Sequence, residues 1–570
     1  MDNYVGMNKF GHHASATLLS ADKNGYRFEI LLKERLTRKK YDAGSIHGPL
    51  AQIAKKIDFP KALFFENSAF DNPLVMEKRW DSRIPYFQIL QHLKIGASSA
   101  NLNPSVSFVT HHLCHAYAAL AVSPFEKSLI VVLDGRGNFN GSFPPEHPEK
   151  KEFPVLNSVT GHLELSTECC TVYFQNGPVL TPVHKDWQAS ELSFGLAGAS
   201  YGLGRMYGTA ARYIFGSFND AGKLMGLAPF GRGTSLDNLA PFINALNWDL
   251  CFRGAGKSDW ERSGNFQHYA DIAATVQDYY ELKLVELLED LRRRFPDYSH
   301  LILTGGCALN CQANSLISGK RIFDSVFVPP FPGDESISLG AAVYGCLSKT
   351  SECWKPLPLD EQRGNWGPLN SIPTSNSIEN CFKGFRIERH QNIAAFCAWL
   401  LGEAKIIGWF QGRSESGPRA LGNRSLLANP LSPGISDYLN NHIKKRESFR
   451  PFAPSCLFEK VHEYFDVPSG FESPFMSFAP KLRASHRQLL AEVGHIDGSA
   501  RVQTVRSAQN PRFYDLIDAF GNLTGVWCIL NTSLNVMGEP IVETLEDAKR
   551  LLKNLPLFGM AVEDYFVYNC

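Results

Sequence analysis

The sequence has no excess of charge of either sign. Lysine plus arginine number 57 in the 570 residues, and aspartate plus glutamate also number 57. A protein that coats nucleic acid or lies on an anionic membrane surface needs a surplus of positive charge. The balance therefore predicts no nucleic-acid partner and no membrane partner, although it is compatible with a local basic pocket.

Long hydrophobic runs are also missing. The longest extends from Ile393 to Leu401 and is far shorter than a membrane span. The first residues do not show a basic stretch followed by an apolar stretch, which is the pattern of a secretory signal. We therefore expect a soluble, cytoplasmic protein.

Several common sequence motifs are absent. No two of the 13 cysteines have the C-x-x-C spacing. Because a chain of this length needs no disulfide staples, we expect mostly reduced cysteines. There is no P-loop, and no G-x-G-x-x-G lies between a strand pattern and a helix pattern. Ordinary kinase-type and NAD-binding folds are therefore not indicated.

Short apolar runs alternate with helical patterns along most of the chain, which predicts an α/β protein. The runs 128–133 and 301–304 are typical of buried strands. Asn24-Gly25 between two apolar runs predicts a hairpin. At about 150 residues per domain, the chain is long enough for more than one domain.

The strongest candidate boundary is a stretch rich in proline, glycine and serine, which we interpret as a linker at 351–374. We predict a first domain over 1–350 and a second over 375–570. The stretch at about 139–190 is predicted to be an insertion with its own short strands.

Three histidines lie close together in the segment Thr110-His-His-Leu-Cys-His115. On a helix, His111 and His115 would project from one face, where two imidazoles can share a metal ion. A histidine-rich helix start is the alternative. A zinc protease would need a glutamate where the chain has His112, so that class is disfavoured.

Two aspartates are candidate metal ligands. Asp134 directly follows the run 128–133 and precedes Gly135 and Gly137. Its carboxylate could bind a metal, and the backbone N–H groups of the glycine-rich turn could bind phosphate oxygens. Such a segment is more often an ordinary turn. Asp334 precedes a helical pattern, where an N-cap is the alternative role.

Two glycine-rich segments fit nucleotide binding. Gly305 and Gly306 follow a strand pattern, and the helical pattern after Asn310 could receive a phosphate at its N-terminus. Lys223 lies three residues before Gly226 in a similar glycine-rich setting. A lone Gly-Gly turn is structural more often than not.

A basic region lies in the C-terminal half, with seven lysines and arginines over residues 413–450. A solvated charged face is the simplest explanation. The alternative is a pocket for phosphate groups, in which arginine makes bidentate hydrogen bonds and lysine supplies a mobile charge. Further along, Ser533 follows an apolar run and is a candidate nucleotide ligand or part of a turn.

Taken together and in this order, the segments resemble the O-carbamoyltransferase family of the NodU, CmcH and TobZ type. The matching segments lie at 12–16, 34–40, 111–115, 133–135, 222–228, 305–310, 338–342, 417–422, 450–455 and 531–533. They span nearly the whole chain, and so many motifs in one order make the resemblance specific.

The resemblance implies an N-terminal domain of the actin and sugar-kinase class (ASKHA, TsaD-like) and a C-terminal YrdC-like domain. The C-terminal domain would form carbamoyl adenylate from carbamoyl phosphate and ATP, with Mg²⁺ accompanying the nucleotide. The N-terminal domain would then transfer the carbamoyl group to a hydroxyl of a small-molecule natural product. The identity of the acceptor and the oligomeric state stay open.

The resemblance also implies roles for individual residues. His12 would be the general base, but the family usually has an aspartate where this chain has His13, which could compete for the role. The implied ligands of a metal, with iron(II) expected, are His111, His115, Asp134 and Asp334. The implied carbamoyl-phosphate residues are Lys444, Arg450 and Arg501. The implied nucleotide-binding residues are Lys39, Gly135, Gly137, Lys223, Gly226, Gly305, Gly306, Asn310, Arg419 and Ser533.

Two alternative functions remain at this point. One is a tRNA threonylcarbamoyl-type transferase with both domains fused, against which the balanced charge argues. The other is a non-catalytic nucleotide-binding protein of the ASKHA class, which would bind ATP without turnover that depends on carbamoyl phosphate.

Overall fold

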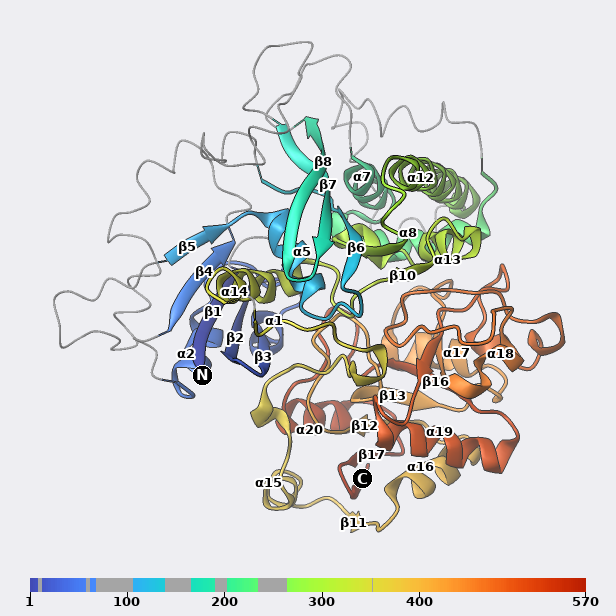
Figure 1. Cartoon of the computed structure of the whole chain (residues 1–570). Helices are drawn as coiled ribbons and strands as arrows, with labels where there is room; N and C mark the ends of the chain where they lie inside the picture. Colours follow the sequence, from blue (N-terminus) through green and yellow to red (C-terminus); the bar gives the residue numbers. More distant parts are fainter. Residues whose placement is uncertain are drawn as a thin grey trace. The chain divides into compact units, whose positions relative to one another are not determined.

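The computed structural model describes residues 1–8, 13–57, 62–67, 106–138, 166–189, 202–233, 264–350 and 352–569 (Figure 1). The chain forms two compact units. The first contains Met1–Leu36 and Tyr41–Leu357, and the second contains Thr37–Lys40 and Pro358–Cys570. The short segment Thr37–Lys40 therefore packs with residues that lie far away in the sequence.

The first unit contains two five-stranded sheets. The strands of one sheet, in spatial order, are β3 (Gly25–Leu32), β2 (Ser15–Asp22), β1 (Asp2–Asn8), β4 (Leu63–Asn67) and β5 (Val106–Val109). Those of the other are β8 (Val179–Ala189), β7 (Ser166–Asn176), β6 (Lys127–Leu133), β9 (His300–Thr304) and β10 (Ser325–Phe327). In each sheet the first three strands are antiparallel and the last two add in parallel, so the two sheets repeat one topology.

Several predicted elements are confirmed. The runs 128–133 and 301–304 lie in β6 and β9, and β2 and β3 form a hairpin closed by the pair Asp22 and Gly25. The described part of the stretch 139–190 forms β7 and β8, so the expected strands are present. β7 pairs with β6 over Cys170–Asn176 and β8 pairs with β7, so both strands belong to the same sheet.

Helices of the first unit flank these sheets, and their bounds follow the chain order: α1 (Lys33–Thr37), α2 (His47–Ala54), α5 (His111–Leu120), α7 (Leu203–Phe215), α8 (Ala221–Leu227), α12 (Phe266–Arg294), α13 (Cys311–Lys320) and α14 (Ile337–Leu347). Helix α14 packs against both α5 and β1. Two glycines allow this close approach. A Cβ on Gly340 would lie 1.8 Å from the carbonyl oxygen of Cys114, and one on Gly6 would lie 1.8 Å from that of Ser338.

The second unit is built on one eight-stranded mixed sheet. Its strands, in spatial order, are β11 (Ile387–Arg389), β18 (Tyr565–Tyr568), β17 (Gly559–Val562), β12 (Ile407–Phe410), β13 (Arg424–Ala428), β16 (Cys528–Ser533), β14 (Ala453–Leu457) and β15 (Gln503–Val505). Helices α16 (Ile393–Gly402) and α19 (Pro511–Thr524) cover one face, and α15 (Ser375–Cys381) and α20 (Leu545–Asn554) contribute to the core on the other. Successive side chains of each strand point to opposite faces of the sheet, so they pack alternately into one core and the other.

The cysteines are mostly reduced, as expected: nine described cysteines are free. The exception is a disulfide between Cys456 and Cys528, which lie opposite each other on β14 and β16. Among the described residues, no helix is both long and apolar enough to cross a membrane.

Candidate functional site

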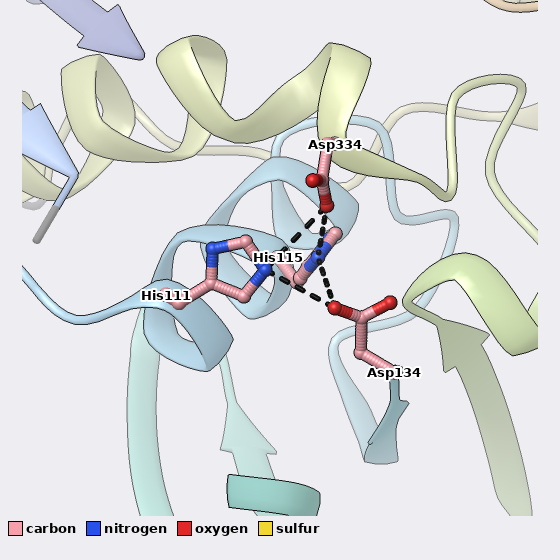
Figure 2. Close-up of side chains that lie close together, drawn as sticks. All are labelled: His111, His115, Asp134 and Asp334. Carbon is pink, nitrogen blue, oxygen red and sulfur yellow. Dashed lines mark hydrogen bonds and ion pairs between the residues drawn. The ribbon is translucent and has the colours of Figure 1, made fainter. Parts of the chain in front are cut away.

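Four predicted metal ligands converge in the first unit (Figure 2). His111 Nε2 lies 3.2 Å from Asp134 Oδ2 and 3.5 Å from Asp334 Oδ1. His115 Nε2 lies 3.5 Å from Asp334 Oδ1 and 4.0 Å from Asp134 Oδ2. All four ligand atoms lie within 4.8 Å of one another. The structure therefore brings together residues that are up to 223 positions apart in the sequence.

Local structure explains how each ligand reaches the cluster. His111 and His115 are one turn apart on α5, and Asp134 directly follows β6. Asp334 begins a short 3₁₀ turn that leads into α14. Because α14 contacts α5 at Gly340, this packing sets the distance between Asp334 and the two histidines.

The cluster is deficient in positive charge. Burial by itself would lower the pKa of His111, but the Asp334 and Asp134 carboxylates outweigh burial and raise it to about 10. Burial would raise the pKa of Asp134, but the hydrogen bond with His111 and the charges of His115 and His111 together outweigh burial and lower it. The buried carboxylates thus call for a cation, which is either a proton on His111 or a metal ion.

The donor set fits a divalent transition metal. Both ring nitrogens of His115 are buried and make no hydrogen bond, although Nε2 faces Asp334. Two imidazole nitrogens and two carboxylate oxygens suit zinc, iron(II) or manganese(II). A metal at this point would satisfy the His115 nitrogen that faces the carboxylates.

The Gly305-Gly306 turn supports Asp134. Gly306 N donates a hydrogen bond of 3.0 Å to Asp134 Oδ1. Gly305 has φ 88°, and a Cβ there would lie 2.1 Å from the carbonyl oxygen of Leu133. Only glycine fits both the left-handed conformation and this close approach.

A fully buried ion pair between Lys185 and Glu168 lies on the α5 side of the β7–β8 hairpin. Thr171 pairs with Lys185 across the hairpin, so the two side chains project to the same side. Thr171 makes a hydrogen bond of 2.8 Å with His112 of α5, so this side faces α5. Cys169 falls outside the strand pairing, and this bulge turns Glu168 to the same side as Lys185.

Glu168 in turn fixes the loop that follows Asp134. Glu168 Oε2 accepts a hydrogen bond from Asn138 N at 2.8 Å, and its backbone carbonyl accepts one from Gly137 N at 2.9 Å. Asn138 Oδ1 accepts a hydrogen bond from His111 N at 2.6 Å. The ion pair therefore positions both a loop and a helix that carry predicted metal ligands, a role that no sequence motif indicated.

A second candidate site lies in the second unit, around Lys444. This lysine ends a π-helical turn and is buried, and its Nζ donates to the Ser533 carbonyl oxygen and, at 2.9 Å, to Asn535 Oδ1. The bonds place Ser533, a predicted nucleotide ligand, beside a predicted carbamoyl-phosphate residue.

The surroundings of Lys444 are strongly cationic. Burial, followed by the charges of Arg446, Arg450 and Lys40, lowers the pKa of Lys444 well below its usual range. Burial, Arg450 and Arg501 also lower the pKa of Arg446. Clustered cations that destabilise one another would be stabilised by a bound anion. Arg446 and Lys40 were not predicted for this site; Arg446 lay within the basic run, whereas nothing in the sequence placed Lys40 there.

The segment Thr37–Lys40 is anchored to the second unit by Arg38. Its guanidinium donates to the carbonyl oxygens of Pro540 at 2.7 Å and Ile541 at 2.9 Å. It also lies 3.4 Å from an Asp547 carboxylate oxygen. These contacts explain how a lysine from the N-terminal part of the chain acts on Lys444.

The predicted nucleotide ligands belong to two units rather than one. The first unit contains Gly135, Gly137, Lys223, Gly226, Gly305, Gly306 and Asn310, and the second contains Lys39, Arg419 and Ser533. Lys223 pairs with Asp220 at 3.0 Å, and Asn310 caps α13 by accepting a hydrogen bond from Ala313 N at 3.1 Å. Lys39 is exposed.

The predicted general base, His12, lies outside the described residues. His13 is described, and its ring packs edge-on against Tyr41 with 5.3 Å between centroids. Glu335, next to the predicted metal ligand Asp334, is buried. Burial raises the pKa of Glu335, and the charge of His13 opposes this rise.

Comparison with known proteins follows the same division of the chain. Residues 67–343 match the family model described as Carbamoyltransferase N-terminus, and residues 398–569 match Carbamoyltransferase C-terminus. The nodulation protein NolNO of Sinorhizobium fredii is 31% identical over 98% of this chain and 79% of its own length. The 3'-hydroxymethylcephem-O-carbamoyltransferase of Amycolatopsis lactamdurans is 34% identical over 61% of this chain and 64% of its own length.

Among solved structures, full-length HypF in the phosphate- and nucleotide-bound form is 12% identical over 62% of this chain and 56% of its own, with a TM-score of 0.35. A likeness this distant carries no argument about function.

Proposed function

The chain belongs to the carbamoyltransferase family, and from that premise we propose that it is an ATP-dependent O-carbamoyltransferase. The second unit forms carbamoyl adenylate from carbamoyl phosphate and ATP. The first unit transfers the carbamoyl group to a hydroxyl of a small-molecule natural product. The observation that carries the proposal is the cationic cluster around Lys444, which suits a small dianion such as carbamoyl phosphate.

In the activation step, Lys444, Arg450 and Arg501 bind carbamoyl phosphate. Hydrolysis releases phosphate and leaves carbamate, whose oxygen attacks the α-phosphorus of ATP and displaces pyrophosphate. The fixed cations stabilise the charge that develops on the phosphoryl oxygens. Arg446 and Lys40 add to this field, and Ser533 and Arg419 contact the nucleotide, which carries Mg²⁺.

In the transfer step, His12 takes the proton of the acceptor hydroxyl, whose oxygen attacks the carbamoyl carbon. The bond from that carbon to the adenylate oxygen breaks, and AMP leaves with the electron pair. The four ligands of the first unit would hold a divalent ion, with iron(II) expected, which supplies Lewis-acid stabilisation of the leaving phosphate. Asp134 is kept in place for this role by Gly306 N.

The fold assignment is part of the proposal. The two five-stranded sheets of the first unit repeat one strand order, and we assign this unit to the ASKHA class that the resemblance implies. We assign the second unit as the YrdC-like part. The glycines, Lys223 and Asn310 of the first unit would then contact the adenylate, and Lys39 the nucleotide of the second.

Pyrophosphate release tests the activation step. The purified protein, incubated with ATP and carbamoyl phosphate, should release pyrophosphate, and Arg450→Ala should abolish that release. Arg386→Ala, an exposed arginine paired with Glu388 in the same unit, is the matched control and should leave the rate unchanged. Full pyrophosphate release by Arg450→Ala would refute the assignment of this pocket.

A further inference from the structure

The β7–β8 hairpin has a second chemically distinct side. Thr171 and Lys185 face α5, as the hydrogen bond from Thr171 to His112 shows. Because neighbouring residues of a strand point to opposite faces, Cys170 and Asp186, which pair directly across the hairpin, project to the other side. His184 lies two positions before Asp186 and shares that side.

These three side chains form a compact group of possible metal ligands. One ligand atom from each of Cys170, His184 and Asp186 lies within 4.8 Å of the other two. His184 Nε2 is 3.1 Å from Asp186 Oδ2. Cys170 is a buried free cysteine, whereas the side chains of His184 and Asp186 are 23% and 51% exposed, so that an ion could enter from solvent.

We propose that Cys170, His184 and Asp186 form a second metal site, selective for a borderline-soft divalent ion such as zinc. A thiolate, an imidazole and a carboxylate are the ligands that zinc takes in proteins, and three protein ligands leave a fourth position for water. The site shares no ligand with the centre at His111 and lies on the opposite side of the hairpin. It is independent of the proposed carbamoyl transfer.

A zinc ion at this point would join β7 to β8 where β7 borders Leu133, the residue before Asp134. The ion would therefore hold the strand register beside the first metal centre. An ion that binds only the folded protein also stabilises it by mass action.

Cobalt(II) distinguishes the two centres. The described ligands at His111 include no thiolate, so of these two centres only the Cys170 site can give a thiolate-to-cobalt charge-transfer band in the near ultraviolet. The full-length protein, stripped of metal and titrated anaerobically with cobalt(II), should show this band. His111→Ala should retain it, and Cys381→Ser, which removes a partly exposed thiol of the second unit, should also retain it.

Three variants test the ligands themselves. Cys170→Ser should abolish the band. Asp186 is exposed and His184 is partly buried, so Asp186→Asn and His184→Ala should fold normally and keep the test valid if Cys170→Ser does not fold. Loss of an outer-shell partner already costs about 10- to 100-fold in metal affinity, so each of these two should weaken cobalt binding at this site at least tenfold. Absence of the band in the unmodified protein, or cobalt affinity unchanged in both His184→Ala and Asp186→Asn, would overturn the proposal.

Discussion

The two candidate sites differ in the sign of their excess charge: the first has excess negative charge and the second has excess positive charge. In the first unit, Asp134 and Asp334 are gathered with two imidazoles, and the pKa of His111 rises to about 10 because a proton there balances the carboxylates. In the second unit, the pKa of Lys444 falls because it is buried among other cations. One site therefore calls for a cation and the other for an anion.

This contrast explains why the net charge was uninformative about function. Each site keeps its imbalance because surrounding groups hold it in place: Glu168 and Asn138 in the first unit, Ser533 and Asn535 in the second. A preorganised charge in a protein interior acts more strongly than the same charge in water. Two local fields of opposite sign can thus coexist in a chain whose charges sum to zero.

We expect the largest effect from His111→Ala, which should impair the first site and leave the second site intact. His111→Ala should remove the metal bound by the first unit and slow carbamoyl transfer about a thousandfold or more, because Lewis-acid stabilisation contributes several kcal/mol. Pyrophosphate release should persist, since the cationic cluster is untouched. Metal content by mass spectrometry and both activities should be measured on one preparation. Loss of pyrophosphate release together with transfer would contradict the separation.

The buried ion pair should matter far more than an exposed one. Glu168→Gln removes the negative charge that faces the buried Lys185 ammonium, and should lower the free energy of unfolding by about 3–5 kcal/mol. Glu286→Gln, in the exposed pair with Lys283, should change it by about 1 kcal/mol or less. Chemical denaturation of the metal-free protein measures both.

The double variant Glu168→Leu/Lys185→Met is the control for that pair. It removes both charges and should recover much of the lost stability, while metal affinity at His111 stays reduced because Asn138 has lost its acceptor. Metal affinity equal to that of the unmodified protein would show that the pair does not position the centre.

Substitution of Arg446 tests the cationic cluster of the second unit. Arg446→Ala removes one cation from the cluster and should weaken carbamoyl-phosphate binding about 10- to 100-fold, as expected for a charge-assisted contact of about 1.5–3 kcal/mol. KM for carbamoyl phosphate, followed by pyrophosphate release, checks this, with Arg386→Ala again as the control. Metal content should not change, and an unaltered KM would remove Arg446 from the site.

The last prediction is a pH dependence of the metal-free protein. The pKa of His111 is about 10 in the folded protein and about 6.5 in the unfolded chain, so folding favours the protonated form. The stabilisation from His111 is complete below about pH 6.5 and is lost as the pH rises through about 10. Thermal unfolding in EDTA should show this decline, and His111→Asn should not. Parallel curves for the two proteins would contradict it.

The elements could be predicted where the pattern was local. Asn24-Gly25 gave the hairpin, and the apolar runs gave β6 and β9, because turn chemistry and strand burial act over a few residues. The spacing of His111 and His115 placed both imidazoles on one face of α5 for the same reason.

The pairing of the strands within 139–190 could not be predicted, because the partner strand is distant in the sequence. β7 joins the sheet through hydrogen bonds to β6, and β8 through hydrogen bonds to β7, which periodicity does not reveal. The disulfide is similar: Cys456 and Cys528 are 72 residues apart, and only the register of β14 against β16 places them opposite each other.

By itself, the sequence determined the α/β class, the local geometry of the histidine pair and, through motifs in one order, the resemblance to a carbamoyltransferase. Only the tertiary structure decided that Glu168 turns toward Lys185, that Arg38 carries Lys40 to the second unit, and that Cys170 shares a side with His184. The physical reason is that a bulge, a long-range ion pair and a strand register each depend on contacts between distant residues, and no short window of sequence contains both partners.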